Sequence, residues 1–239
     1  MTRPAFYALE SGGWRDYITL LHPPYTAWHL SYVAIGATLA PEFEGRRLVA
    51  ALAAFFLAMG VGAHALDELT DRPLQTRIPN GVLVTLAAVS IGGAVAIGIA
   101  ASLAWTLWLL PFVAVGAFLV VAYNLELFGG LFHNYFWFGF AWGAFPLLTG
   151  YLVTAEELRV EALLAALFAL LTSFVQRTLS TPVRDVRRRV TNVTGTVALT
   201  DGTREEITPE TLMGAPETAL RLLAAAMVSL AAALLVLRF

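Results

Sequence analysis

The sequence predicts an all-α polytopic membrane protein with about seven transmembrane helices, and two observations lead to this class. The chain is 58% hydrophobic and 13% charged over 239 residues, about half the charged fraction of an average soluble domain. No Asp, Glu, Lys or Arg occurs between Arg77 and Glu126. A single helix over residues 78–125 would measure roughly 72 Å, about twice the hydrocarbon thickness of a bilayer. We therefore expect a hairpin of two spans there.

Apolar stretches follow one another along the chain, and each is expected to cross the membrane once. The segment Tyr17 to Leu21 precedes the first stretch and is expected to lie at the membrane interface. The stretches cover residues 25–41, 46–66, 80–102, 104–123, 133–154, 160–179 and 216–237. We therefore expect a helical bundle over residues 1–179, an arginine-rich loop over 180–215 and a last transmembrane helix over 216–239.

The expected loop departs most from membrane composition. Residues 193–207 alternate weakly between apolar and polar types and contain Asp201-Gly202, a strong hairpin signal. We expect a small cytoplasmic β-hairpin there. A disordered loop is the alternative, because an isolated two-stranded hairpin is only marginally stable in water.

The basic residues are divided unevenly between the two sides of the predicted bundle. Seven crossings place the N-terminus and the connections after the second, fourth and sixth spans on one side. Arg46, Arg47, Arg159 and Arg238 fall on the other side, and the rest of the 15 basic residues fall on the first. Because arginine is enriched in cytoplasmic loops, we expect a multi-pass protein of the cell membrane whose N-terminus is cytoplasmic.

Cysteine and lysine are both absent, and all 15 basic residues are arginine. Without cysteine the chain has no disulfide, no thiolate-ligated zinc, no iron–sulfur cluster and no thiol nucleophile. Without lysine it forms no Schiff base, which excludes retinal-binding proteins and other imine chemistry. The net charge of −2 does not point to nucleic acid, and no nucleic-acid partner is expected. The sequence does not predict an oligomeric state.

Acidic residues cluster where the second span ends. His64, Asp67, Glu68 and Asp71 stand at i, i+3, i+4 and i+7, and therefore on one stripe of a helix. Side chains four residues apart on a helix lie about 5–6 Å from each other. That spacing suits one Mg²⁺ ion held by Asp67 and Asp71, with substrate phosphates completing its coordination.

Arg72 and Arg77 follow this stripe directly, and guanidinium groups bind phosphate oxygens well. Carboxylates and arginines at one helix end therefore suit a magnesium diphosphate. The alternative is a solvated helix end whose acids pair with these two arginines. Such clusters are ordinary at membrane interfaces, so spacing alone leaves both interpretations open.

The run from Asp67 through Arg72-Pro73-Leu74 to Arg77-Ile78 resembles the first aspartate-rich motif of the UbiA superfamily of intramembrane prenyltransferases and the residues after it. Other similarities occur in the family's order between about residues 20 and 180. These are His22-Pro23-Pro24 before the first span, Tyr123-Asn124 at the end of the fourth, and Phe140 to Gly150 in the fifth.

The resemblance implies a helical bundle that transfers a prenyl group from a prenyl diphosphate to a hydrophobic acceptor, with membrane lipid around it. It implies that Asp67, Asp71 and Tyr123 are catalytic, that Asp67 and Asp71 bind Mg²⁺, and that Asp185 is a second-site metal ligand. Aromatic faces would stabilise an allylic cation. The substrate-binding residues it implies are His64, Arg72, Arg77, Asn124 and Arg184.

The chain departs from the family at three points. Ala63 stands where the family usually has Asn, Asp185 is the only acid after the sixth helix with Arg189 four residues later, and we expect seven spans where the family typically has nine. His64 can bind substrate or simply pack, and the arginine run can bind diphosphate or flank the span at anionic lipid.

Two further hypotheses therefore stand beside the prenyltransferase. One is a non-catalytic relative that binds or moves an isoprenoid, quinone or other lipid, which the reduced second motif favours. The other is a CDP-alcohol phosphotransferase, which also uses aspartates at the membrane edge. The longer aspartate pattern of that class does not occur in this sequence, so it ranks last.

Overall fold

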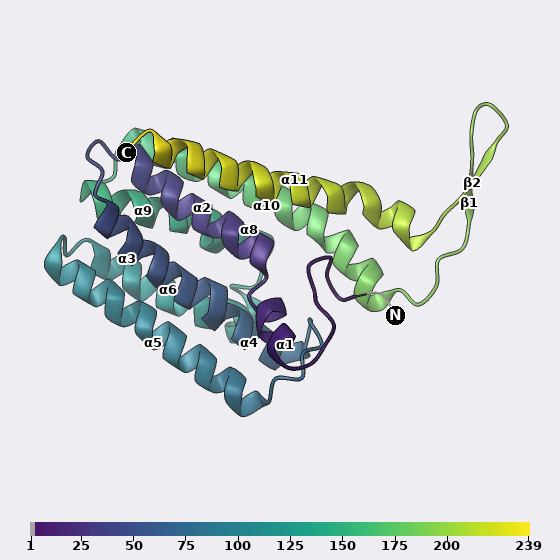
Figure 1. Cartoon of the computed structure of the whole chain (residues 1–239), viewed down its shortest axis with the longest axis horizontal. Coiled ribbons are helices and arrows are strands. Elements are labelled where there is room, and N and C mark those ends of the chain that lie inside the picture. The colour runs from purple at the N-terminus through teal and green to yellow at the C-terminus, as the bar shows by residue number, and fades with distance from the viewer. Residues whose placement is uncertain (1–2) are drawn as a thin grey trace.

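The computed structural model describes residues 3–239 and is helical over most of them. Long helices lie side by side in one elongated bundle, and a β-hairpin projects from one end (Figure 1). The long helical stretches are α2 (Pro23–Leu39), α3 (Gly45–Phe55) with η1 (Phe56–Ala63) and α4 (His64–Asp71), α5 (Asn80–Ala104), α6 (Leu109–Asn124), α8 (Tyr135–Gly139) with η2 (Phe140–Ala144) and α9 (Phe145–Ala155), α10 (Val160–Arg189) and α11 (Pro209–Val236). The short elements are α1 (Trp14–Leu20), α7 (Leu127–Gly130), β1 (Thr196–Ala198) and β2 (Arg204–Glu206).

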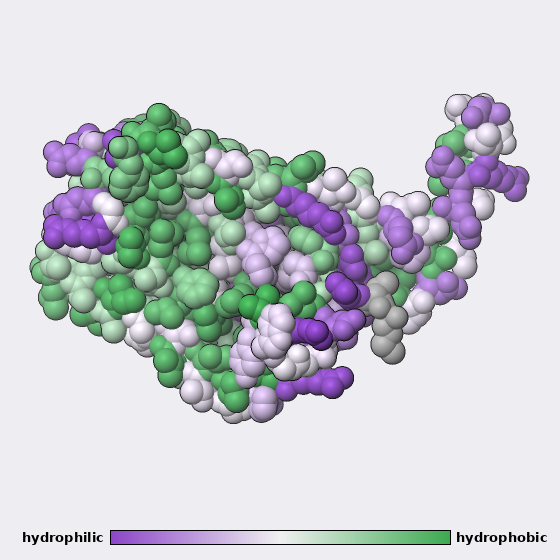
Figure 2. Space-filling model, in the orientation of Figure 1, coloured by the Kyte–Doolittle hydropathy of each residue, from purple (hydrophilic) through white to green (hydrophobic). Residues whose placement is uncertain are grey.

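The class of all-α membrane protein is confirmed, because long apolar helices dominate the bundle. Five stretches are long and apolar enough to cross a membrane: Gly45–Asp71, Asn80–Ala104, Tyr135–Ala155, Val160–Arg189 and Pro209–Val236. Helix α6 is apolar but has 16 residues, and α2 has 17. Apolar side chains cover the middle of the visible surface, and polar side chains gather toward its two ends (Figure 2). The count of seven crossings remains a prediction.

Helix α2 is the most buried long helix, and two glycines set its contact with α9. A Cβ atom added to Gly36 would lie 2.0 Å from the Leu147 carbonyl oxygen. One added to Gly150 would lie 2.2 Å from the Val33 carbonyl oxygen. The two helix backbones therefore touch, and only glycine permits this approach, as at other close helix crossings in membranes.

Two of the long stretches contain a π-helical segment. η1 joins α3 to α4, and η2 joins α8 to α9, without a break in the helix. A π turn contains one more residue than an α turn, so the side chains after it are offset by one position from the α-helical periodicity before it. The α4 stripe is therefore oriented by η1 and not by the periodicity of α3 alone.

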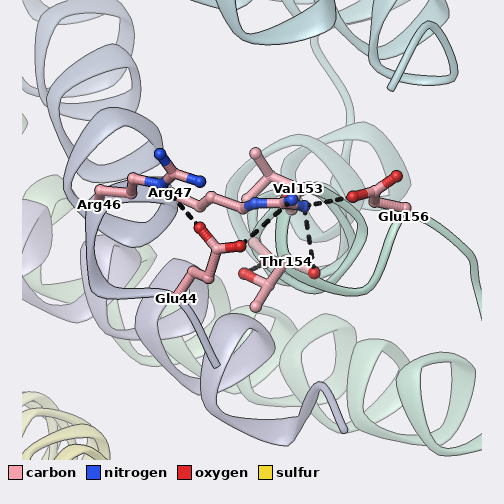
Figure 3. A network of polar contacts seen from close by, with 7 residues as sticks. Glu44, Arg46, Arg47, Val153, Thr154 and Glu156 are labelled. Carbon is pink, nitrogen blue, oxygen red and sulfur yellow. Dashed lines mark hydrogen bonds and ion pairs between the residues drawn. The ribbon is translucent and has the colours of Figure 1, made fainter. Parts of the chain in front are cut away.

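At one end of the bundle, Arg47 at the start of α3 joins two helices. Its guanidinium donates to the carbonyl oxygens of Val153 and Thr154, 3.1 and 3.4 Å away, at the end of α9. It also pairs with Glu156 at 2.8 Å and Glu44 at 3.4 Å (Figure 3). These contacts join two helix ends and satisfy carbonyls that have no partner within their own helix. We call this region the Arg47 end.

The C-terminal residues complete the same end. Arg238 donates to the carbonyl oxygens of Thr38 and Ala40, where α2 stops. Its charge also complements the negative end of the α2 dipole. Arg47 and Arg238 thus both donate to backbone carbonyl oxygens at this end.

The expected β-hairpin is confirmed, with β1 and β2 antiparallel and Ala198 opposite Arg204. The Asp201 carboxylate accepts from the Thr203 backbone and hydroxyl, which fixes the turn. The segment boundaries differ from those expected, because α10 continues to Arg189 and α11 begins at Pro209. Arginine is a good helix former, so the polar composition after residue 179 does not end the helix.

Candidate functional site

Two pockets of opposite polarity meet inside the bundle, and Tyr123 and Trp142 line both of them. The first, which we call the apolar pocket, is formed by α3, η1, α5, α6, η2 and α9. The second, which we call the polar pocket, is formed by the start of α2, the first half of α4, the end of α6 and the C-terminal half of α10. Ligand sites in proteins are often pockets between helices of a bundle.

The apolar pocket is long and narrow. Its lining on α6 runs from Leu109 to Tyr123, roughly 21 Å along a helix that rises 1.5 Å per residue. Ala94 of α5 lines it with a small side chain, and Phe112 and Phe145 border it. Its shape and chemistry suit an extended hydrocarbon chain.

The polar pocket is rich in arginine and histidine. Its lining includes all 4 histidines of the chain but, among the described residues, Asp67 as its only carboxylate. Four arginines of α10 complete the charged lining. These charged and titratable side chains are His22, His29, His64, His133, Asp67, Arg177, Arg184, Arg187 and Arg188. The excess of positive charge predicts an anionic ligand.

The arginines of α10 differ in how their charges are matched. Arg187 pairs with Glu217 of α11 at 2.7 Å, and both side chains are only 13% exposed. Arg184 donates to the Thr181 hydroxyl at 3.3 Å, and Arg188 donates to the Pro4 carbonyl oxygen at 3.4 Å. Within residues 3–239 neither Arg184 nor Arg188 forms an ion pair, so most of their N–H groups have no anionic partner.

Arg177 connects the polar pocket to the junction with the apolar pocket. It donates to the Tyr123 hydroxyl at 2.7 Å and to the Asn134 carbonyl oxygen at 3.2 Å. Its guanidinium also lies 5.3 Å from the centre of the Phe138 ring. The contact fixes the Tyr123 ring, which also packs edge-on against Trp142 at 5.9 Å.

His22 lines the polar pocket and lies just before α2. Its Nδ1 lies 2.7 Å from the Tyr7 hydroxyl, and its ring stacks on His64 with centroids 4.0 Å apart. Burial, and next the nearby His64, lower the pKa of His22 well below its usual value, so the ring is neutral. Burial raises the pKa of Tyr7 well above its usual value, so the hydroxyl keeps its proton.

The N-terminal segment forms part of the wall of the polar pocket, which the sequence did not predict. Pro4, Ala5, Phe6 and Tyr7 all line it. The Phe6 ring also contacts the Arg221 guanidinium, whose carbon lies 4.7 Å from the ring centre. No periodicity or motif marks these residues, because they form no helix or strand.

The structure brings five of the predicted site residues together at the polar pocket. Asp67, His64, Tyr123, Asn124 and Arg184 all line it. They come from α4, α6 and α10, which are distant in sequence. The ends of the second and fourth predicted spans, which are α4 and α6 in the structure, therefore line the same pocket.

The other predicted residues do not line the polar pocket. Asp71 is the last residue of α4 and is exposed. Arg77 is also exposed. The Asp185 side chain is 50% exposed and lies 3.5 Å from Arg189, because it projects about 100° around α10 from Arg184.

Glu68 and Arg72 have structural contacts instead. The buried Glu68 carboxylate accepts from the Leu74 N–H at 2.9 Å and from the Thr76 N–H at 2.8 Å. Arg72 donates to the Thr76 and Ile78 carbonyl oxygens at 3.3 and 2.7 Å. Residues 72–78 thus fold back against α4, and the diphosphate contact implied for Arg72 is not the arrangement observed.

The side chains at this pocket do not fit the predicted magnesium site. That site needs Asp67 and Asp71, with Asp185 as a further ligand, yet only Asp67 reaches the pocket. Within residues 3–239 no group of three His, Cys, Asp or Glu side chains is arranged to hold a metal ion. Since several arginines line the same space, its charge favours an anion over a divalent cation. The magnesium site remains a prediction from the sequence.

In comparisons with known proteins, no family model matches the chain, and no curated protein or solved structure matches it. The resemblance to the UbiA superfamily therefore rests on the sequence motifs alone.

Proposed function

We propose that this protein is a membrane prenyltransferase that binds a prenyl diphosphate across the two pockets. The diphosphate lies in the polar pocket, and the prenyl chain lies in the apolar pocket. The observation that carries this proposal is the meeting of the two pockets at Tyr123 and Trp142. An amphiphile with an anionic head and a long apolar tail matches both the charge and the length of this space.

The junction suits cleavage of the bond between the prenyl C1 atom and the diphosphate oxygen. The electron pair leaves with the diphosphate, and guanidinium groups stabilise the negative charge that develops there. The prenyl cation is then next to the faces of Tyr123, Trp142 and Phe138, which stabilise it through cation–π attraction. The acceptor forms the new bond to C1, and its proton passes to the Asp67 carboxylate.

The test is prenyl transfer by the purified full chain in nanodiscs. A panel of labelled polyprenyl diphosphates is combined with aromatic and lipid-alcohol acceptors, with and without Mg²⁺. We expect a prenylated product and a loss of about 10²- to 10⁴-fold in rate for Asp67→Asn, since the proton acceptor is removed. Asp71→Asn is the matched control, because Asp71 is exposed and outside the pocket.

A non-catalytic protein that binds or moves an isoprenoid or other lipid is the second candidate. The single carboxylate of the polar pocket favours it, since a transferase site commonly has more acid groups. Tight retention of a prenyl diphosphate without any product would support this candidate and contradict the transferase. Absence of both binding and transfer would contradict both candidates.

We further propose seven crossings of a cell membrane, with the polar pocket open to the cytoplasm. The distribution of arginines supports this orientation. The chain contains no cysteine, so single cysteines report sidedness without background. Thr200→Cys in the hairpin should react with a membrane-impermeant maleimide only after cell lysis. Glu42→Cys, before α3, should react in intact cells, and the reverse pattern would contradict the orientation.

A further inference from the structure

The C-terminal part of α10 presents three arginines on one face. Arg177, Arg184 and Arg188 stand at i, i+7 and i+11, within about 40° of one another around a helix of 3.6 residues per turn. All three line the polar pocket. Asp185 and Arg189 lie on another face of α10 and pair with each other there.

These three arginines have fewer anionic partners in the protein than Arg187 has. Within the described chain none of them forms an ion pair, whereas Arg187 pairs with Glu217. Their guanidinium groups carry three positive charges toward a space whose lining has one carboxylate, Asp67. Guanidinium groups with free N–H pairs are well suited to two or more phosphate oxygens.

Neutral donors supplement the arginines. The Nε2 atom of His22 is buried and has no hydrogen-bond partner within residues 3–239. When the Tyr7 hydroxyl donates to Nδ1 of this neutral ring, the ring proton resides on Nε2. A buried N–H without a partner is costly, so a ligand oxygen at this position is favourable.

The chain's own N-terminal segment contacts two arginines of this helix end. Arg187 donates to the Arg3 carbonyl oxygen at 3.1 Å, and Arg188 donates to the Pro4 carbonyl oxygen at 3.4 Å. Residues 4–7 then contribute to the pocket wall. Partial exclusion of water at Arg188 strengthens the attraction between its guanidinium group and an anion, whereas Arg184 is exposed.

We propose that Arg177, Arg184 and Arg188 form a diphosphate site that works without a divalent metal. The identification of the ligand as a diphosphate rests on the proposed function. The site takes the position at the end of the sixth long helix where the family resemblance leads one to expect a second metal-binding motif. Here guanidinium charges replace the metal as the partner of the leaving group.

The two arrangements predict opposite effects of Asp67. In a metal-bridged site Asp67 attracts the diphosphate through the cation, so its removal weakens binding. In the arginine site the Asp67 carboxylate repels the diphosphate and competes for the guanidinium groups, so its removal leaves binding equal or tighter. A substitution that keeps size and removes charge, Asp67→Asn, therefore separates the two arrangements.

The experiment is calorimetric titration of inorganic pyrophosphate into the full chain in nanodiscs of neutral lipid, with EDTA present. We expect binding in EDTA and no tightening when Mg²⁺ replaces it. The double variant Arg184→Gln and Arg188→Gln should bind about 10²- to 10⁴-fold more weakly, since it removes two charge-assisted hydrogen bonds. Arg189→Gln removes the same charge from the same helix outside the pocket and should not change the affinity.

Several outcomes would overturn the inference. These are binding that requires Mg²⁺, loss of binding in Asp67→Asn, or equal losses in the double variant and in Arg189→Gln. Thermal unfolding of each variant shows that it is folded. If the double variant does not fold, Arg184→Gln alone is titrated, because that exposed side chain makes one weak contact within the chain.

An anionic phospholipid headgroup offers related chemistry, and the experiment distinguishes it. Inorganic phosphate should bind more weakly than pyrophosphate, and phosphatidic acid in the nanodiscs should not displace pyrophosphate. Displacement by phosphatidic acid that depends on Arg184 and Arg188 would overturn the inference. Metal-free pyrophosphate binding without prenyl transfer contradicts the proposed function alone, whereas transfer that requires both Mg²⁺ and Asp67 contradicts the arginine site alone.

Discussion

The two ends of the bundle use arginine in different ways. At the Arg47 end, Arg47 is 11% exposed and binds two glutamates and two backbone carbonyls, so its charge is matched within the protein (Figure 3). At the other end, Arg184 and Arg188 have one hydrogen bond each and no ion pair within the described chain. The comparison shows that the two ends differ in the partners of their arginines: carboxylates and carbonyls at the Arg47 end, and few protein groups at Arg184 and Arg188.

The same contrast recurs between neighbours on α10. Arg187 pairs with a glutamate that is 13% exposed, and Arg188 has only a carbonyl partner. A matched buried pair is destabilising to break because it leaves one charge without a partner. An arginine without an ion pair leaves no buried carboxylate without a partner when it is replaced, and it is free to pair with the diphosphate proposed above. Substitutions at the two ends should therefore affect different measurements.

The largest expected effect is at the Arg47 end. Arg47→Met should lower the free energy of unfolding by about 2–4 kcal/mol, because the Val153 and Thr154 carbonyls lose a charged donor, whereas the 45% exposed Glu156 stays hydrated. Chemical unfolding in detergent measures the change. Arg46→Gln is the control, since the Arg46 side chain is 73% exposed and should contribute about 0–1 kcal/mol. Equal effects of the two substitutions would contradict the structural role of Arg47.

The next effect separates Arg187 from Arg188. Arg187→Gln should lower the free energy of unfolding by about 1.5–3 kcal/mol, because Glu217 loses a charged hydrogen bond. Arg188→Gln should change stability by less than about 0.5 kcal/mol and weaken pyrophosphate binding about tenfold. Unfolding and titration of both variants measure this. Stability loss confined to Arg188→Gln would reverse the comparison.

A smaller effect is expected from filling the apolar pocket. Ala94→Trp places a large side chain in the space assigned to the prenyl tail. Affinity for a long prenyl diphosphate should fall by roughly tenfold, which corresponds to about two methylene groups kept from burial. Affinity for inorganic pyrophosphate should stay the same. A parallel loss for both ligands would show that the two pockets do not bind separate parts of one molecule.

The smallest effect concerns pH and is limited to the polar end, where all 4 histidines lie. The pKa of His22 is lowered on folding, so the unfolded chain binds more protons below pH about 6.5. Stability should therefore fall as pH drops below that value, by at most about 1.4 kcal/mol per pH unit from this group, and stay flat above it. His22→Asn should flatten the slope in denaturation curves measured against pH.

The sequence predicted the helical class and the hairpin, because these depend on local composition and spacing. The family resemblance pointed to Asp67 and Tyr123, and both line the polar pocket. It did not predict that Glu68 binds the 72–78 loop, since this contact requires the chain to fold back after α4. Asp67 and Asp71 both lie on α4, as their spacing predicted. Only Asp67 lines the polar pocket, because helical spacing does not show how far the pocket extends.

The sequence also did not predict which helices pack against each other. Gly36 and Gly150 permit the closest helix contact, yet nothing in their local sequence distinguishes them from glycines in open surroundings such as Gly92. Arg177, Arg184 and Arg188 have a spacing that places them on one helix face, and it applies because α10 continues to Arg189. Nothing in the sequence marked residues 4–7 as part of the pocket wall.

The π-helical segment η1 has a consequence for how this protein can change over time. A wide turn contains a surplus residue, so deletion of one residue between Phe56 and Ala63 would return it to ordinary α geometry without breaking the helix. Because the wide turn absorbs that residue, α4 would keep its orientation and Asp67 would still line the polar pocket. This segment can therefore lose one residue without moving the side chains that follow it.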